Sequence, residues 1–172
     1  MCSSDLWALA SGEKADAQPL LPQCPQRFPN RFFRVNGMLS EGALAPALSD
    51  AAVVAFNDAG SQLMALKPAD AAAWGDPKAK PAPLWTAKLD AGQMADAIAI
   101  VGDQVWVAGG HGDARSGQRQ GGKGWLRSFG LKDGKPGAAQ ELPAPPTFQG
   151  IASADGRLLL ALDDGTLRAY GR

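Results

Sequence analysis

Residues 85–108 read WTAKLDAGQMADAIAIVGDQVWVA, and residues 138–161 read AAQELPAPPTFQGIASADGRLLLA, which is the same pattern 53 positions later without a gap. Four apolar pairs carry the match: Leu89 with Leu142, Ile98 with Ile151, Val105 with Leu158, and Val107 with Leu160. Downstream, GWLRSFG at 124–130 returns as GTLRAYG at 165–171, only 41 positions later, so the first copy carries a longer loop. A unit of about 50 residues built from short alternating strands and turn dipeptides indicates a repeat protein, and propeller blades are the leading interpretation.

We therefore predict an all-β fold of two to three four-stranded antiparallel propeller blades, with the last blade lacking its outer strand. The three units span about residues 45–89, 97–142 and 149–172. They form an incomplete ring, because a closed propeller needs about four to eight blades. In the first unit, strand patterns at 52–56 and 62–66 flank a turn at 57–60. The strand at 84–89 ends the span of this unit and is also counted as the opening strand of the second.

The last unit contains strand patterns at 150–154, 157–162 and 166–170, and no fourth. An open sheet edge invites pairing, and propellers often cover it with a strand from the other end of the chain. We expect that strand in sequence that precedes this chain. Within the chain, Phe32 to Val35 is the hypothetical substitute.

The N-terminal part of the chain carries little blade pattern. Residues 1–6 (MCSSDL) match what a common sequencing adaptor encodes after a start codon, so we interpret them as a scar and the natural N-terminus as missing. Residues 7–44 are predicted to be a proline-rich linker with a strand at 31–36, and Asn36-Gly37 is a hairpin turn signal. A short helical turn is predicted at 69–74, within a proline-containing loop.

Charge and composition exclude several classes of partner. Lys+Arg and Asp+Glu number 17 each, which gives no electrostatic reason to expect nucleic acid or an anionic membrane as partner. No apolar run approaches the ~18–20 residues that span a bilayer, so no membrane span is predicted. Cys2 and Cys24 have no second Cys or His at metal-ligand spacing, so we predict neither a disulfide framework nor a metal site.

About half of the chain resembles the last blades of the PQQ-binding-like β-propeller repeat proteins, the quinoprotein-like repeat class. The likeness is carried by PLWTAKLDA (83–91), DQVWVAGG (103–110), GWLRSFGLKDGKPGAAQELPAPPTFQGIA (124–152) and DGRLLLALDDGTLRAYG (155–171). The resemblance implies that Lys132 to Lys135 turn between the third and fourth strands of a blade, and that Trp85 packs one blade against another. It also implies a periplasmic or extracellular protein, with upstream blades and a further protein as partners.

The resemblance does not extend to the cofactor. Quinoprotein dehydrogenases of that class hold PQQ with a Trp floor, an adjacent-cysteine disulfide, and carboxylate or Asn ligands to calcium. This chain has no Cys-Cys pair and no Asn after Asn57, so we expect neither PQQ nor calcium in it. The expected function is a non-catalytic binding or scaffolding segment of a larger, exported protein. The alternative is the C-terminal part of a quinoprotein-type oxidoreductase whose active site lies in upstream blades.

Gly109 to Gly124 (GGHGDARSGQRQGGKG) is the one stretch with candidate ligand-facing residues. They are His111, Asp113, Arg115, Arg119 and Lys123. We expect a loop between the second and third strands of a blade, which either binds an anionic ligand or is a solvated insertion; one His without partners makes neither a metal site nor a triad. Residues 117–123 fit a P-loop, but Gly124 replaces the required Ser or Thr and a strand follows, so nucleotide binding is rejected.

No catalytic, cofactor or metal residues are predicted. Asp163-Asp164 belongs to an Asp-Asp-Gly turn, and Ser128 lies in a strand pattern without a nearby His. Arg127 and Arg168 recur at equivalent positions, which indicates a structural role on the blade surface.

Overall fold

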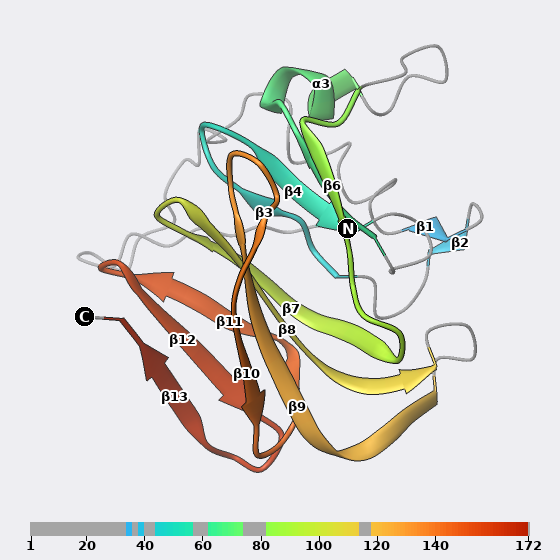
Figure 1. Cartoon of the computed structure of the whole chain (residues 1–172), viewed down its shortest axis with the longest axis vertical. Coiled ribbons are helices and arrows are strands. Elements are labelled where there is room, and N and C mark those ends of the chain that lie inside the picture. The colour runs from blue at the N-terminus through green and yellow to red at the C-terminus, as the bar shows by residue number, and fades with distance from the viewer. Residues whose placement is uncertain are drawn as a thin grey trace, which may run out of the picture.

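The computed structural model describes residues 34–35, 38–39, 44–56, 62–73, 82–113 and 118–171, and within them three antiparallel sheets stack in chain order (Figure 1). The first sheet contains β3 (Ala47–Leu48), β4 (Val53–Phe56), β5 (Gln62–Leu66) and β6 (Trp85–Lys88). The middle sheet contains β7 (Gln93–Val101), β8 (Gln104–Asp113), β9 (Gln118–Gly130) and β10 (Pro136–Leu142). The third sheet contains β11 (Pro146–Ala154), β12 (Arg157–Leu162) and β13 (Leu167–Tyr170).

This architecture confirms the predicted fold class. Each sheet orders its strands as they follow in the chain, two sheets have four strands, and the third has three. Among the described residues no strand pairs with the outer edge of β13. One detail was wrong: the strand at 84–89 is β6, and it pairs with β5 as the outer strand of the first sheet rather than with the second unit.

The two copies of the repeat fold in the same register. Ile98 lies opposite Val107 in the middle sheet, and Ile151 lies opposite Leu160 in the third. Both hairpins close with two residues, but their turns differ. Asp155 and Gly156 both take positive φ (50° and 72°), as a type I′ turn requires, whereas in the other hairpin only Gly102 does (60°), as in type II′.

The middle sheet buries both of its faces, because successive residues of a strand point to opposite sides. One face packs on the first sheet and forms the first core; the other packs on the third sheet and forms the second core. The first core contains Ala47, Ala52, Val54, Leu63, Ala65 and Trp85 from the first sheet, and Ile98, Val105, Val107, Trp125 and Phe129 from the middle sheet. The second core contains Ala97, Ala99, Ala108, Leu126, Leu142 and Ala144, with Leu158, Leu160 and Leu162 from the third sheet.

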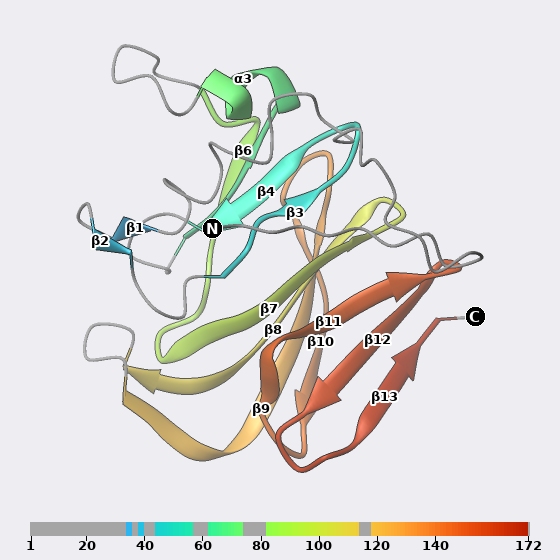
Figure 2. The same cartoon turned by 180° about the vertical axis from the view of Figure 1, so that it is seen from behind.

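The sheets are arranged like blades. The first strand of the middle sheet, β7, lies beside the first strands of both neighbours, β3 and β11. Opposite views show the middle sheet between the other two, with β13 at the outside of the third (Figures 1 and 2). The repeat-defining residues lie in or against the two cores, with Leu89 partly buried against the first and Ile151 partly buried against the second.

Trp85 links the first sheet to the middle sheet. Its indole Nε1 donates a 2.7 Å hydrogen bond to the Leu131 carbonyl, just after β9. The ring lies against Gly134, where an added Cβ would come within 2.5 Å of Trp85 Cε3. Gly134 belongs to the turn Lys132 to Lys135, which joins β9 to β10 where the resemblance placed it.

The remaining elements are short. The helix α3 (Pro68–Ala73) lies at the predicted helical turn. The strands β1 (Arg34–Val35) and β2 (Met38–Leu39) pair with each other and lie far from β13 in both views (Figures 1 and 2). Arg34 and Val35 therefore do not complete the third sheet, contrary to the hypothesis; Phe32 and Phe33 lie outside the described residues. No helix in the described ranges is long and apolar enough to cross a membrane.

Candidate functional site

The glycine-rich stretch 109–124 forms strands over most of its described length, and the expectation of a loop there was wrong. β8 continues to Asp113 and β9 begins at Gln118, so the two strands extend beyond the sheet as a ribbon. His111 lies opposite Gln120 and Gly112 lies opposite Arg119, after a register shift between Gly109 and His111. Backbone hydrogen bonds hold such a ribbon without any apolar alternation, which is why the side-chain pattern did not predict it.

The structure describes the side chains of two candidate ligand-facing residues, His111 and Lys123. His111 is exposed at the end of β8 and lines a surface depression. Lys123 is exposed on β9 and forms an ion pair with Glu141 of β10. Asp113 and Arg119 lie in the paired strands, and Arg115 lies outside the described residues. Of the two whose side chains the structure describes, His111 lines the depression and Lys123 does not.

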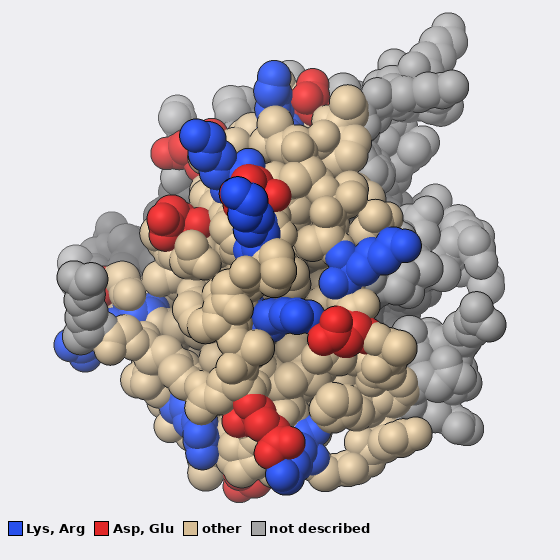
Figure 3. All heavy atoms as spheres, in the orientation of Figure 1, with Lys and Arg blue, Asp and Glu red and all other residues tan. Residues whose placement is uncertain are grey.

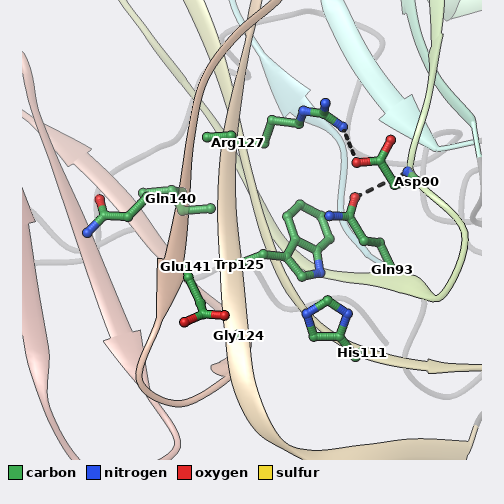
Figure 4. A pocket seen from close by; sticks show the side chains of 10 residues that line it. Asp90, Gln93, His111, Gly124, Trp125, Arg127, Gln140 and Glu141 are labelled. Atoms are coloured by element: carbon green, nitrogen blue, oxygen red, sulfur yellow. Dashed lines mark hydrogen bonds and ion pairs between the residues drawn. The ribbon is translucent and has the colours of Figure 1, made fainter.

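The depression has a volume of about 270 Å³ and lies beside β9 of the middle sheet (Figure 4). It is lined by Asp90, Gln93, His111, Gly124, Trp125, Leu126, Arg127, Ala139, Gln140 and Glu141. Trp125 and Arg127 come from β9, and Asp90 comes from the connection between β6 and β7. The site is therefore built by the middle sheet and the segment that joins it to the first.

A buried hydrogen-bond chain fixes the back of the depression. Trp125 Nε1 donates to the Gly110 carbonyl at 2.7 Å, and the Gly110 N–H donates to Asp96 Oδ2 at 3.1 Å. Asp96 is fully buried, at the register shift between Ala95 and Ala97. A Cβ at Gly109 would lie 1.8 Å from the Met94 carbonyl oxygen, so the backbones approach too closely there for any other residue. The indole is thus held in one orientation.

The side of the depression is closed by an ion pair. Arg127 Nη1 lies 2.9 Å from Asp90 Oδ2, and the guanidinium carbon lies 5.8 Å from the centre of the Phe129 ring. The Asp90 N–H donates to Gln93 Oε1 at 3.2 Å, which orients the amide (Figure 4). Arg127 thus has the structural role predicted from its recurrence. Its charge is balanced by Asp90, as that of Lys123 is by Glu141.

The depression brings together the Trp125 indole, the amide of Gln93 and the ion pair of Arg127 with Asp90. In the part of the chain that the structure describes, no three or more His, Cys, Asp or Glu side chains gather as a metal site would need. Two carboxyl groups in turns outside the lining of the depression have lowered pKa values. The Lys135 ammonium lowers the pKa of Asp133, and the hydroxyl of Thr166 lowers the pKa of Asp164 by hydrogen bonding. On the face seen in Figure 3, acidic and basic side chains are interspersed.

Sequence reasoning missed Asp96, Trp125 and Asp90 as members of this site. Asp96 could have been recognised from the sequence, because it is an acidic residue inside the apolar strand QMADAIAIV. A carboxylate is buried only with hydrogen-bonding partners, so its position indicates such partners. The pairing of Asp90 with Arg127 spans 37 residues and has no local sequence pattern.

Comparisons with known proteins find only distant structural likenesses. No protein family matches the sequence, and no curated protein is similar to it. Among solved structures, the computationally designed Ika4 protein has a TM-score of 0.49 at 17% identity, covering 78% of this chain and 68% of that one. BamB from Moraxella catarrhalis has a TM-score of 0.27 at 14% identity, covering 72% of this chain and 47% of BamB. These likenesses are too low to carry an argument about function.

The class that the fold defines is an all-β protein of stacked, blade-like antiparallel sheets. The chain spans about half the length of BamB.

Proposed function

We propose that this chain is a non-catalytic binding and scaffolding segment of a larger, exported β-propeller protein, and that it holds neither PQQ nor calcium itself. In this role the segment presents sheet surfaces to other sheets and to protein partners. The periplasmic or extracellular location is part of the proposal and rests on the sequence resemblance to quinoprotein-like repeats.

The observation that carries the proposal is the uncovered face of the third sheet. The third strand of each sheet carries a leucine at the same place. Its side chain is 0% exposed in the first sheet (Leu63), 1% in the middle sheet (Leu126) and 70% in the third (Leu167). The first two are buried because the next sheet covers them. Burial of apolar area stabilises by about 25 cal/mol per Å². The equivalent face is buried in the first and middle sheets and exposed in the third, so we expect a further sheet to cover the face of the third sheet as well.

The chemistry of the depression supports binding over catalysis. The charge of its Arg127 is balanced by Asp90, and the indole of Trp125 is fixed by the Gly110 carbonyl. A hydrolytic or redox centre needs a reactive group placed beside a base or a cofactor. The lining residues offer an aromatic edge, amides and paired charges, which are the groups of a recognition surface.

Three measurements test the proposal. The purified protein is titrated with PQQ and calcium, and dye reduction is followed; we expect none, and reconstituted dye reduction would establish the quinoprotein-type oxidoreductase instead. The uncovered face is tested with bis-ANS fluorescence. Leu167→Asp is expected to lower dye binding more than Leu84→Asp, a control at another exposed leucine (44%). Equal effects would count against the face. Cell fractionation tests the location.

A further inference from the structure

The outer edge of β13 has backbone groups that point away from the sheet. The Leu162 N–H donates to the Thr166 carbonyl at 2.9 Å across the β12–β13 pair. In an antiparallel ladder the inward and outward groups alternate with every residue. The N–H and C=O groups of Leu167 and Ala169 therefore point outward, and no described strand receives them.

The other two sheets show what occupies this edge. β6 and β10 occupy it in the first and middle sheets, and they are equivalent in sequence, 53 positions apart. The equivalent segments are Thr-Ala-Lys-Leu at residues 86–89 and Ala-Gln-Glu-Leu at residues 139–142. Both strands thus carry a small residue, a neutral residue, a charged residue and a leucine, in that order.

The leucine at the end of this order has a defined place. In the middle sheet Gln140 lies opposite Leu126, and Leu142 lies opposite Gly124, two residues further. Leu142 and Leu126 are therefore diagonal neighbours on one face, and both are buried in the second core. At the third sheet, the equivalent leucine of an added strand lies diagonally next to Leu167, whose side chain is 70% exposed.

We propose that the free edge of β13 binds an extended segment of a partner protein by β-strand addition, and that this segment carries the order small, neutral, charged, leucine. Main-chain hydrogen bonds to Leu167 and Ala169 give the attachment, and the leucine that covers Leu167 gives the specificity. This inference rests on the proposed scaffolding function and names the chemistry of one partner.

A second copy of this chain fits the edge less well. In a two-fold antiparallel pairing β13 is its own partner, and its sequence Leu-Arg-Ala-Tyr lacks the order that β6 and β10 share. The face beside the edge also carries small residues: Ala152, Ala161 and Ala169 share it with Leu159 and Leu167. Two such faces brought together would leave space between them, and unfilled space costs stability.

The test uses a peptide of the chain's own sequence, residues 135–143 (KPGAAQELP), labelled with fluorescein and added to the full chain. Fluorescence anisotropy is expected to show a dissociation constant of about 10–100 μM, because a contact of this size is at the weak end of protein interfaces. The same peptide carrying Leu142→Asp, and the chain variant Leu167→Asp, are each expected to weaken binding at least tenfold.

The backbone contact is tested with a matched pair of chain variants. Ala169→Pro removes an outward N–H and is expected to abolish binding, whereas Ala169→Thr keeps the N–H and is expected to bind as the unaltered chain does. Should Ala169→Pro fail to fold, hydrogen exchange of the unaltered chain gives the same answer: the peptide should slow exchange at the Leu167 and Ala169 amides and leave Thr166 and Arg168 unchanged.

Three outcomes would overturn the inference. One is the absence of peptide binding up to about 1 mM, since that corresponds to less than about 4 kcal/mol of binding free energy. Another is equal binding by the Pro and Thr variants. The third is a dimer in sedimentation that Ala169→Pro converts to monomer, which would assign the edge to a second copy. None of these touches the dye-reduction and bis-ANS results, so failure here is distinct from failure of the scaffolding proposal.

Discussion

A methyl group added at Gly134 tests how tightly the first two sheets are joined. Gly134 takes φ of 66° in the turn between β9 and β10, and the Trp85 indole of the first sheet lies over it. A Cβ at this position would lie 2.5 Å from Trp85 Cε3 and 2.7 Å from Cδ2, closer than real Cβ contacts. Gly134→Ala therefore introduces two separate costs, one from the backbone and one from the contact between sheets.

The two costs differ in size and in cause. An L-residue in the left-handed region costs about 1–2 kcal/mol, and forced overpacking costs about 1–3 kcal/mol more. We expect Gly134→Ala to lower the free energy of unfolding by about 2–5 kcal/mol, as the sum of these. Gly156→Ala is the matched control, because Gly156 has φ of 72° and nothing within 4 Å of an added Cβ. It is expected to show the backbone cost alone.

A double-mutant cycle with Trp85→Leu isolates the contact. The leucine removes the ring that the new methyl group meets, so Gly134→Ala should cost only the backbone term in that background. The expected coupling between the two substitutions is about 1–3 kcal/mol, within the range seen for residues in contact. Urea unfolding at 25 °C, followed by circular dichroism, gives the free energies. Additivity within about 0.5 kcal/mol, the usual scatter of independent sites, would refute a tight contact between Trp85 and Gly134.

Three further predictions concern the third sheet and its turn. Leu126→Asp should unfold the chain or cost more than about 3 kcal/mol, because it buries a carboxylate in the second core, whereas the equivalent Leu167→Asp should change stability by less than about 0.5 kcal/mol; equal losses in thermal melts would show that Leu167 is buried. Tyr170→Phe should stabilise by about 1 kcal/mol, since the Tyr170 hydroxyl is buried without a partner and the equivalent residue in the middle sheet is Phe129; urea unfolding that shows a loss would contradict this. Thr166→Val should raise the pKa of Asp164, because the Thr166 hydroxyl donates to Asp164 Oδ1 at 2.7 Å and holds that pKa below its ordinary value. The lowered folded-state pKa stabilises the fold near neutral pH, and this is lost as pH falls through that pKa; a carboxyl NMR titration that shows no change in the variant would refute the assignment.

The sequence matched Ile98 with Ile151 and Val107 with Leu160 as equivalent positions of a repeat, and the structure pairs Ile98 with Val107 and Ile151 with Leu160 for a physical reason. Strand residues alternate between faces, so a two-residue turn between two alternating segments leaves one register that keeps both apolar sets on the same side. The turn pairs Gly102-Asp103 and Asp155-Gly156 supply those two residues. Local information was sufficient, because every determinant lies within a hairpin.

The candidate site could not be predicted in this way. The ribbon at 109–124 is held by backbone pairing, and its glycines and polar residues show no alternation that would indicate strands. The ion pair of Arg127 with Asp90 and the bond from Gly110 to Asp96 arise only after the sheets stack and the strands shift register. Such contacts depend on the tertiary fold, so a repeat pattern predicts the surfaces of each sheet and not the site that they build together.

The two cores also show that the stacking has a direction. In the second core the middle sheet contributes mainly alanine, with Ala97, Ala99 and Ala108, and the third sheet contributes leucine, with Leu158, Leu160 and Leu162. In the first core the first sheet contributes three alanines, Ala47, Ala52 and Ala65, beside Val54, Leu63 and Trp85, and the middle sheet contributes large residues without an alanine. All alanines of each core thus come from the sheet or connection that precedes the next sheet. The open face of the third sheet repeats the small-residue side, with Ala152, Ala161 and Ala169, so close packing requires its cover to bring large aliphatic side chains. Binding at the β13 edge places a leucine on this face, and the edge and the face are therefore parts of one docking surface.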